Sequence, residues 1–388
     1  MTPIPDNLLF VKRRAGNIIA PIQPIKDGEN YSYYSRRSGA GRSLPGYPSV
    51  YFLLVDLLGF EHWGQDEKVA WTVPIEFKGE RFLISHRKMG LGLFCSEEQE
   101  GMAKEIVDLI KKGVRASEPY FEWRAEQAIE ASKLNVSNHC NDLYGRYLYH
   151  LECYDSAVID AKTSKANIEP IQDNSLDNLN SLFSSAFLSN QNADIISWNA
   201  IAAVEAFYSW TEHLFIHLAI LGSTVANGRA VADLVGQEWN VKFKKVLNLS
   251  DQDNKKFYDQ LVELRREVRN FVAHGAFGKN GQAFQFHSGA GAVPVHQQPT
   301  SGKTKFSVGD SLVMDDAKAV ALTRAFVDHL WSGSLAPARI YLEESSLPTI
   351  LTYGLDGTYT NAMADSSSMT DFVTHLVYIS DQAANMDW

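Results

Sequence analysis

The spacing of apolar residues changes character near residue 95. Before it, apolar runs are short and broken by glycines, and "KVAWTVPIEFKGERFLISHRKMGLGLFC" alternates as a hairpin followed by another strand would. A tight turn is expected at Gly79-Glu80. "VYFLLVDLLGF" is expected to form a short buried element, and "SGAGR" at 38–42 a flexible loop. The first 95 residues are therefore predicted to be rich in strands.

Beyond residue 95 the apolar positions follow helical periods. "SEEQEGMAKEIVDLIKKGV" has acids in its first turn and ends in lysines and Gly113, as helix ends favour. "DDAKAVALTRAFVDHLWSG" has acids at its start and Gly333 after its end. Further helices are predicted over 117–133, 137–165, 193–221, 229–248 and 251–274. Segment 282–308 is typical of short strands around a Gly/Pro loop.

These elements predict an α+β protein with several parts. A chain of 388 residues is long enough for two or three domains. A polar stretch rich in Asn, Ser and Asp, residues 167–194, is expected to contain a link between units. The predicted parts are an α/β N-terminal domain (1–115), a helical connector (116–192), an all-α helical domain (193–333) with a β insertion at about 282–308, and a C-terminal extension (334–388).

Charge and cysteine usage narrow the class of protein. The formal net charge of −10 argues against overall affinity for nucleic acid, so any such site must be local. Three widely spaced cysteines without paired CxxC spacing predict reduced thiols in a cytoplasmic protein and no structural zinc site. No secretory signal is evident at the N-terminus.

The longest apolar stretch, "WNAIAAVEAFYSWTEHLFIHLAILG", is long enough to span a bilayer. It carries two acids and two histidines, whose burial in lipid is costly. We therefore expect a helix in a soluble core and no membrane partner. His213 and His217 lie four residues apart, a spacing that suits metal binding, but the HExxH pattern is absent, and we favour a core or surface role.

The stretch "LRREVRNFVAHGAFG", residues 264–278, ends the predicted helix 251–274. Its apolar positions form a single stripe, while Asn270 and His274 share a face away from that stripe. Arg269 lies roughly 140° from His274 on an ideal helix, so the two converge only if the helix end distorts or a second copy completes the site. In the structural alternative, Arg269 and His274 bond free carbonyls at the helix end and Gly275 is the left-handed residue after it.

The chemistry of these side chains suits RNA cleavage. Histidine can take a proton from a 2′-hydroxyl or give one to a leaving 5′-oxygen near neutral pH. Arginine presents charged donors that match the oxygens of a phosphate in its transition state, and asparagine can orient either partner. Such a mechanism needs no metal or other cofactor.

"RNFVAHG", preceded by "FYDQLVELRREV" and, about sixty residues earlier, by "AIAAVEAFYSW", resembles the HEPN superfamily (higher eukaryotes and prokaryotes nucleotide-binding) over roughly 193–333. That all-helical family has a signature of an arginine, four to six residues and a histidine, which Arg269, Asn270 and His274 match. The resemblance implies a metal-independent endoribonuclease with a composite site across a homodimer, in toxin–antitoxin, CRISPR-associated or phage-defence settings, where an antitoxin or other regulatory protein would be a partner. Some members lack nuclease activity, so the alternative is a non-catalytic module that binds a nucleotide or a partner protein.

Several other residues are candidates for supporting roles. Glu205, in the apolar helix, could pair with Arg269 or Arg265 and orient the arginine, or be a structural or solvent-facing acid. RNA phosphates could be bound by two basic groups, although a solvated charge cluster is the simpler explanation: Lys242, Lys244 and Lys245, and Arg36, Arg37 and Arg42.

A third functional class is a metal-dependent nuclease in the N-terminal part. "PIEFKG" places Glu76 and Lys78 on one face of a predicted strand, the Glu-x-Lys piece of PD-(D/E)xK-type nucleases, with Asp56 or Asp66 upstream as a metal ligand. Lys78 adjoins the predicted tight turn, and alternating charges are common on exposed strands. We therefore rank this reading below the HEPN readings.

Overall fold

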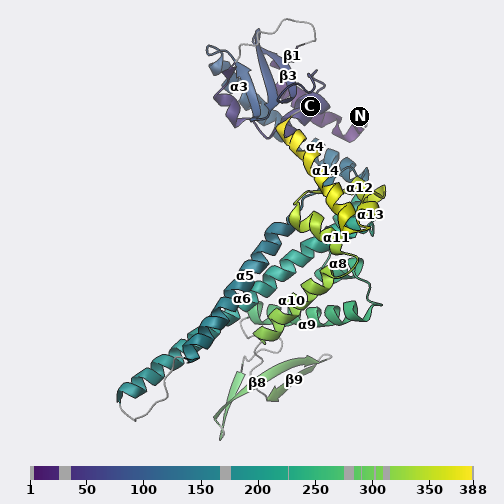
Figure 1. Ribbon diagram of the computed structural model, residues 1–388. Helices are drawn as coiled ribbons and strands as arrows, with labels where there is room; N and C mark the ends of the chain where they lie inside the picture. The colour runs from purple at the N-terminus through teal and green to yellow at the C-terminus, as the bar shows by residue number, and fades with distance from the viewer. Residues whose placement is uncertain are drawn as a thin grey trace. The chain divides into compact units, whose positions relative to one another are not determined.

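The computed structural model describes residues 4–25, 36–166, 176–225, 227–274, 284–289, 291–300, 303–308 and 315–386. The chain divides into two compact units, Met1–Ala131 with Thr374–Trp388, and Ser132–Val373. An antiparallel five-stranded sheet in the first unit and a large helical assembly in the second confirm the α+β prediction (Figure 1). The domain boundaries predicted at 115, 192 and 333 do not coincide with the boundaries of these two units. They remain predictions of where the chain changes from one kind of local structure to another.

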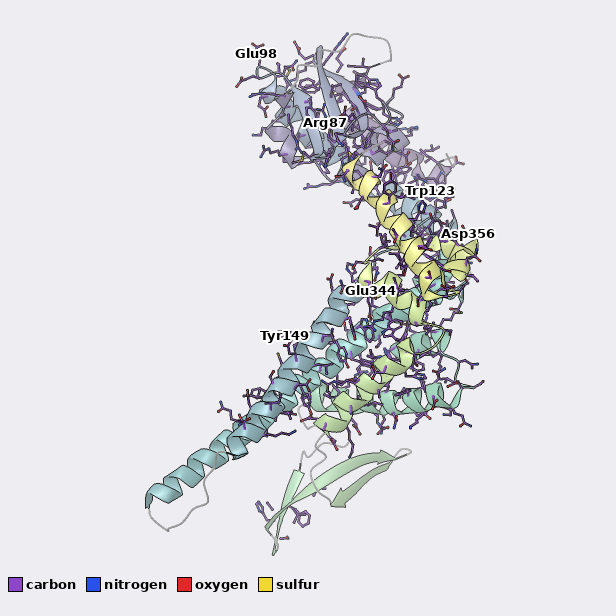
Figure 2. All side chains as sticks on the ribbon, in the orientation of Figure 1. Arg87, Glu98, Trp123, Tyr149, Glu344 and Asp356 are labelled. Atoms are coloured by element: carbon purple, nitrogen blue, oxygen red, sulfur yellow. The ribbon has the colours of Figure 1, made fainter. Side chains whose placement is uncertain are left out.

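The sheet of the first unit has the strand order β1-β3-β4-β5-β2, and its neighbouring strands are antiparallel. Its members are β1 (Ile22–Pro24), β2 (Arg36–Arg37), β3 (Val69–Phe77), β4 (Glu80–Arg87) and β5 (Gly90–Cys95). The predicted hairpin and following strand are confirmed as β3, β4 and β5. The β3–β4 turn needs left-handed backbone, which Gly79 adopts at φ +82° and Lys78 at φ +55°. Arg87 of β4 (labelled in Figure 2) has its guanidinium carbon 3.8 Å from the ring centroid of Phe94 on β5.

Two helical segments lie within the part of the chain predicted to be rich in strands. Helix α1 (Leu9–Ile19) buries Val11, Ala15 and Ile19, a one-face pattern at four-residue spacing. "VYFLLVDLLGF" is helical, with α2 (Tyr47–Tyr51) leading into the π-helical turn Phe52–Leu57. Its continuous apolar run cannot distinguish strand from helix by periodicity, and burial in the tertiary core decided the outcome. Helix α3 (Glu100–Ala116) completes this core, and α4 (Glu118–Glu130) follows it.

The second unit is built around two long helices, α5 (Cys140–Ala166) and α6 (Leu176–Leu221), which lie side by side (Figure 1). Helix α6 begins within the polar stretch predicted to contain a link, of which 167–175 lie outside the described residues. The predicted helix 229–248 is instead two short helices, α7 (Gly228–Val235) and α8 (Trp239–Val246). The Asn227 side chain caps α7 by accepting from the Ala230 N–H at 2.9 Å.

Helices α9 (Gln252–His274) and α10 (Asp316–Trp331) pack against each other and against α6. Between them, β7 (Phe284–Ser288), β8 (Gly291–Thr300) and β9 (Lys303–Val308) form an antiparallel sheet, which confirms the short β insertion.

Aromatic residues fill the core of this helical unit. The Phe326 ring of α10 lies 5.8 Å from Phe207 on α6, 5.7 Å from Phe243 on α8 and 5.6 Å from Phe257 on α9, measured between ring centroids. Trp239 donates from Nε1 to the Thr211 hydroxyl at 2.9 Å, so its buried polar atom is satisfied. The rings thereby set the spacing of the helices that carry the candidate site.

The chain after α10 forms small elements: α11 (Ala336–Arg339), the π-helical turn Ile340–Glu344, α12 (Leu351–Leu355) and α13 (Thr358–Ala362). Strand β10 (Thr349–Ile350) pairs with β6 (Asn135–Val136), which brings this region to the start of α5. Helix α14 (Ser366–Asn385) follows. Within the described ranges, no helix combines the length and apolar composition that crossing a membrane requires.

Candidate functional site

Arg265 on α9 is held by one acid and two aromatic rings. Its Nη2 lies 3.3 Å from Glu212 Oε2 on α6, and its guanidinium carbon lies 5.3 Å from the ring centroid of Tyr208 and 5.9 Å from that of Trp239. Lys242 of α8 shares the same acid, with its Nζ 3.0 Å from Glu212 Oε1. One carboxylate thus joins α6, α8 and α9.

A buried hydroxyl further fixes α9 against α6. Tyr208 donates from its hydroxyl to the Leu261 carbonyl at 2.6 Å. Burial raises the pKa of Tyr208 well above its ordinary value, so this group stays protonated and remains a donor. The turn of α9 that precedes the Arg-x4-His motif is therefore anchored by a hydrogen bond as well as by the ion pair.

Arg269 lies one turn beyond Arg265, and its side chain is exposed. The side chains of Asn270 and His274 lie outside the described part of the chain, but the backbone of α9 is helical through His274. At about 100° per residue, positions 269 and 274 lie about 140° apart around the helix axis. The described backbone is helical up to His274, and Gly275, where the expected distortion would continue, lies outside the described residues.

Of the roles considered for Glu205, that of a solvent-facing acid agrees with its position. Glu205 lies on the exposed side of α6. Arg265 pairs instead with Glu212, seven residues further along the same helix. Glu212 is thus the orienting acid that the sequence interpretation missed.

The predicted lysine cluster is divided by burial. Lys242 is 3% exposed, and its ammonium forms an ion pair with Glu212. For Lys242 to contact a phosphate, this ion pair would have to break. Lys244 and Lys245 are exposed, and Lys244 Nζ lies 4.9 Å from the ring centroid of Tyr258. Only the latter two remain candidates for RNA contact.

The metal-nuclease alternative requires Glu76 and Lys78 of the first unit together with either Asp56 or Asp66. Lys78 instead binds Glu105 of α3 at 2.8 Å, and Asp56 pairs with Arg124 of α4 at 3.2 Å. Across the described ranges, one group of three or more side chains could hold a metal ion, and it includes none of these four. The geometry therefore gives no support to a metal-dependent nuclease there.

The "SGAGR" stretch is folded, in contrast to the flexible loop expected. It contains a 3-10 helix, Ala40–Ser43, and Gly41 lies so close to β5 that a Cβ there would be 2.8 Å from the Leu93 backbone nitrogen. Glu100 Oε1 accepts from the Ala40 N–H and the Ser38 hydroxyl, both at 2.8 Å, and these bonds lower the pKa of Glu100. A carboxylate already occupies the donors that a phosphate would need.

The arginines of this segment also have partners. Arg36 pairs with Glu97 at 3.3 Å, and Arg37 donates from Nη1 to the Met89 carbonyl at 3.1 Å. These arginines stabilise the edge of the sheet, which favours the structural explanation of the basic segment that also includes Arg42.

The metal-binding group is formed by Cys140, His213 and His217, whose ligand atoms all lie within 4.8 Å of one another. The Nε2 atoms of the two histidines are 3.0 Å apart. His217 Nδ1 lies 2.7 Å from Thr349 Oγ1 on β10, and His213 Nε2 accepts from the His139 N–H at 2.9 Å. The sequence indicated the histidine pair but not the cysteine, which lies 73 residues before His213.

Burial keeps this cluster uncharged in the absence of an added cation. It lowers the pKa of His213 to about 4 and that of His217 to about 3, and His213 and His139 add repulsion to His217. The His217 ring also has a hydrogen bond with the Ser137 backbone. Burial raises the pKa of the Cys140 thiol, and the nearby Glu343 carboxylate raises it further.

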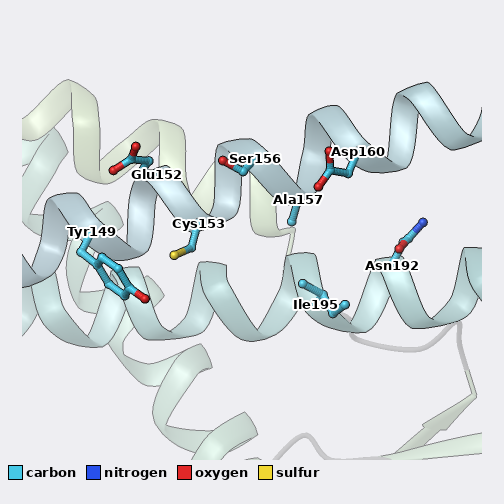
Figure 3. A pocket seen from close by; sticks show the side chains of 8 residues that line it. All are labelled: Tyr149, Glu152, Cys153, Ser156, Ala157, Asp160, Asn192 and Ile195. Carbon is cyan, nitrogen blue, oxygen red and sulfur yellow. The ribbon is translucent and has the colours of Figure 1, made fainter.

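A separate groove of about 510 Å³ lies between α5 and α6 (Figure 3). Its lining includes Glu152, Asp160, Asn192 and Ile195, and Tyr149 hydrogen-bonds Cys153 within it. Two acids and no base among the lining residues make the groove unsuited to an RNA backbone. It contains neither the Arg-x4-His motif nor the Cys–His cluster.

Comparison of the chain with protein-family models, with curated proteins and with solved structures finds no match.

Proposed function

We propose that the chain is a metal-independent endoribonuclease of HEPN type that acts as a homodimer. The observation that carries the proposal is the position of Arg269, which is exposed near the end of α9, next to Asn270 and five positions before His274. Anchoring of the preceding turn through Arg265 and Glu212 supports it, because a transition-state clamp must be held in place. A role in toxin or phage-defence systems belongs to the same proposal.

In the proposed reaction His274 takes the proton of a ribose 2′-hydroxyl, and the resulting oxygen attacks the adjacent phosphorus. The bond from phosphorus to the 5′-oxygen breaks, and that oxygen takes the proton that His274 removed. Arg269 stabilises the charge that develops on the phosphate oxygens, and Asn270 orients the reacting groups. The products are a 2′,3′-cyclic phosphate and a 5′-hydroxyl.

The helical backbone of α9 through His274 supports a composite site. Since positions 269 and 274 lie about 140° apart on one helix, Arg269 of one protomer meets His274 of its partner in this proposal. Exposed Lys244 and Lys245 supply positive charge for the RNA backbone, in a chain whose net charge is −10.

The decisive experiment incubates the full chain with RNA in EDTA and maps the cleavage ends. Cleavage should survive chelation, stop when the RNA carries 2′-deoxyribose at the cut position, and vanish in Arg269→Ala and His274→Ala. Arg266→Ala is the matched control, because Arg266 is an exposed arginine on the same helix that pairs with Glu263. It should cleave as the unchanged chain does.

Mixing the two inactive variants tests the composite site. Heterodimers of Arg269→Ala and His274→Ala chains contain one site with both residues intact, so mixing should restore part of the activity. Absence of cleavage by the unchanged chain under all conditions would favour the non-catalytic nucleotide- or protein-binding module. Cleavage that needs magnesium and depends on Glu76 would favour the metal-dependent nuclease.

A further inference from the structure

The strongest feature outside the proposed nuclease site is the cluster of Cys140, His213 and His217. Cys140 is the first residue of α5, and the two histidines occupy successive turns of α6. Cys140 and His217 are fully buried, and His213 is half-buried. Three potential metal ligands from two elements thus converge at one end of the helical unit.

We propose that Cys140, His213 and His217 form a binding site for one transition-metal ion, with Zn²⁺ the best fit to this set of ligands. A thiolate and two imidazoles are donors that zinc prefers. In a tetrahedral zinc site the nitrogens are roughly 3.4 Å apart, and nitrogen and sulfur roughly 3.6 Å. The Nε2 atoms of the two histidines are 3.0 Å apart, and the ligand atoms of all three side chains lie within 4.8 Å of one another. The expected separations fall between these two distances.

The hydrogen bond of His217 fits this role. A metal-bound histidine usually engages an oxygen with its other ring nitrogen, which fixes the orientation of the ring. His217 Nδ1 lies 2.7 Å from the Thr349 hydroxyl, while its Nε2 faces His213. The arrangement therefore leaves Nε2 to bind the ion.

The start of α5 is also held in place. Asn138 Oδ1 accepts from the Cys140 N–H at 2.9 Å, and Asn138 Nδ2 donates to the Leu342 carbonyl at 3.0 Å. These bonds fix the backbone of Cys140 beside the histidines of α6. The His139 N–H bond to His213 Nε2 is the contact that an ion would replace.

The fourth position lies within reach of solvent. His139, directly before Cys140, has an exposed ring whose centroid lies 5.7 Å from that of His213. The His139 ring is not part of the group whose ligand atoms lie within 4.8 Å of one another, so a water molecule completes the tetrahedron. The ion joins the start of α5 to α6 and, through Thr349, to β10, so its role is to stabilise the helical unit.

The site is tested with the full chain under reducing conditions, by adding Co²⁺ or Zn²⁺. One ion should bind per chain, and Co²⁺ should give a thiolate charge-transfer band with strong visible bands typical of tetrahedral cobalt. X-ray absorption of the zinc form should show one sulfur at about 2.3 Å together with nitrogen or oxygen ligands. Zn²⁺ should raise the unfolding temperature in a concentration-dependent way.

Variants on the same helices give matched controls. Cys140→Ser should abolish the charge-transfer band, and His213→Gln should weaken binding at least tenfold, which keeps the test informative if Cys140→Ser does not fold. Cys153→Ser, a half-buried cysteine on α5 outside the cluster, should bind as the unchanged chain does. Substoichiometric binding, a zinc shell without sulfur, or a band that survives Cys140→Ser would overturn the proposal. These readouts do not involve RNA, so they are independent of the proposed nuclease activity.

Discussion

Replacing Glu212 by Gln is expected to lower the free energy of unfolding of the helical unit by more than the removal of an exposed ion pair would. Gln keeps the size of the side chain but removes the negative charge shared by Lys242 and Arg265. The ammonium of Lys242, 3% exposed, would then be buried without a counterion. Two cations of neighbouring helices would also face each other without the carboxylate between them.

The magnitude follows from the burial of the two partners. Breaking a fully buried pair from one side costs about 3–5 kcal/mol. The Glu212 side chain is 35% exposed, so solvent screens part of the interaction, and we expect a loss of about 2–3 kcal/mol. Asp155→Asn removes the exposed partner of Arg324, where both side chains are more than 40% exposed, and should cost less than about 1 kcal/mol.

The assay is urea unfolding combined with hydrogen exchange of peptides from α6 and α8, which assigns the loss to the helical unit. Adding Lys242→Met to Glu212→Gln should recover at least half of the lost stability, because it removes the unpaired buried charge. Equal destabilisation by Glu212→Gln and Asp155→Asn, or no recovery in the double variant, would refute the reasoning.

Three further predictions concern the two cores and acid stability. Phe326→Ala should lower the free energy of unfolding of the helical unit by about 3–5 kcal/mol, measured by urea unfolding, and a loss below 1 kcal/mol would contradict its central packing. Gly113→Ala should cost about 1–3 kcal/mol, seen as faster hydrogen exchange in α3, because its Cβ would lie 2.9 Å from both Ile19 and Leu53; unchanged exchange would show that these side chains yield freely. In the metal-free protein the pKa of His217 is lowered to about 3, against 6.5 in the unfolded chain, so its contribution to stability is present above pH 6.5 and is lost as the pH falls toward 3. Urea unfolding at a series of pH values should show a loss from this residue of about 3 kcal/mol at pH 4. His217→Gln should make the free energy of unfolding depend less steeply on pH.

Much of the local structure could be predicted because it depends on neighbours in sequence. Helices α3, α9 and α10 followed from apolar spacing and end residues, and the β3–β4 hairpin from alternation around Gly79. Segment 52–57 could not be assigned, because an unbroken apolar run has no period to identify it and only burial in the core makes it helical.

Residue types and helical spacing were enough to predict how α9 ends and that Arg269 and His274 cannot converge on one straight helix. The tertiary structure alone decided which acid meets Arg265. Glu205 and Glu212 are seven residues apart, nearly on the same face of α6 but roughly 10 Å apart along it, so the choice depends on how far α9 is displaced along α6. It also decided that Cys140 joins His213 and His217, because no local period links residues 73 positions apart and only the packing of α5 on α6 brings them together.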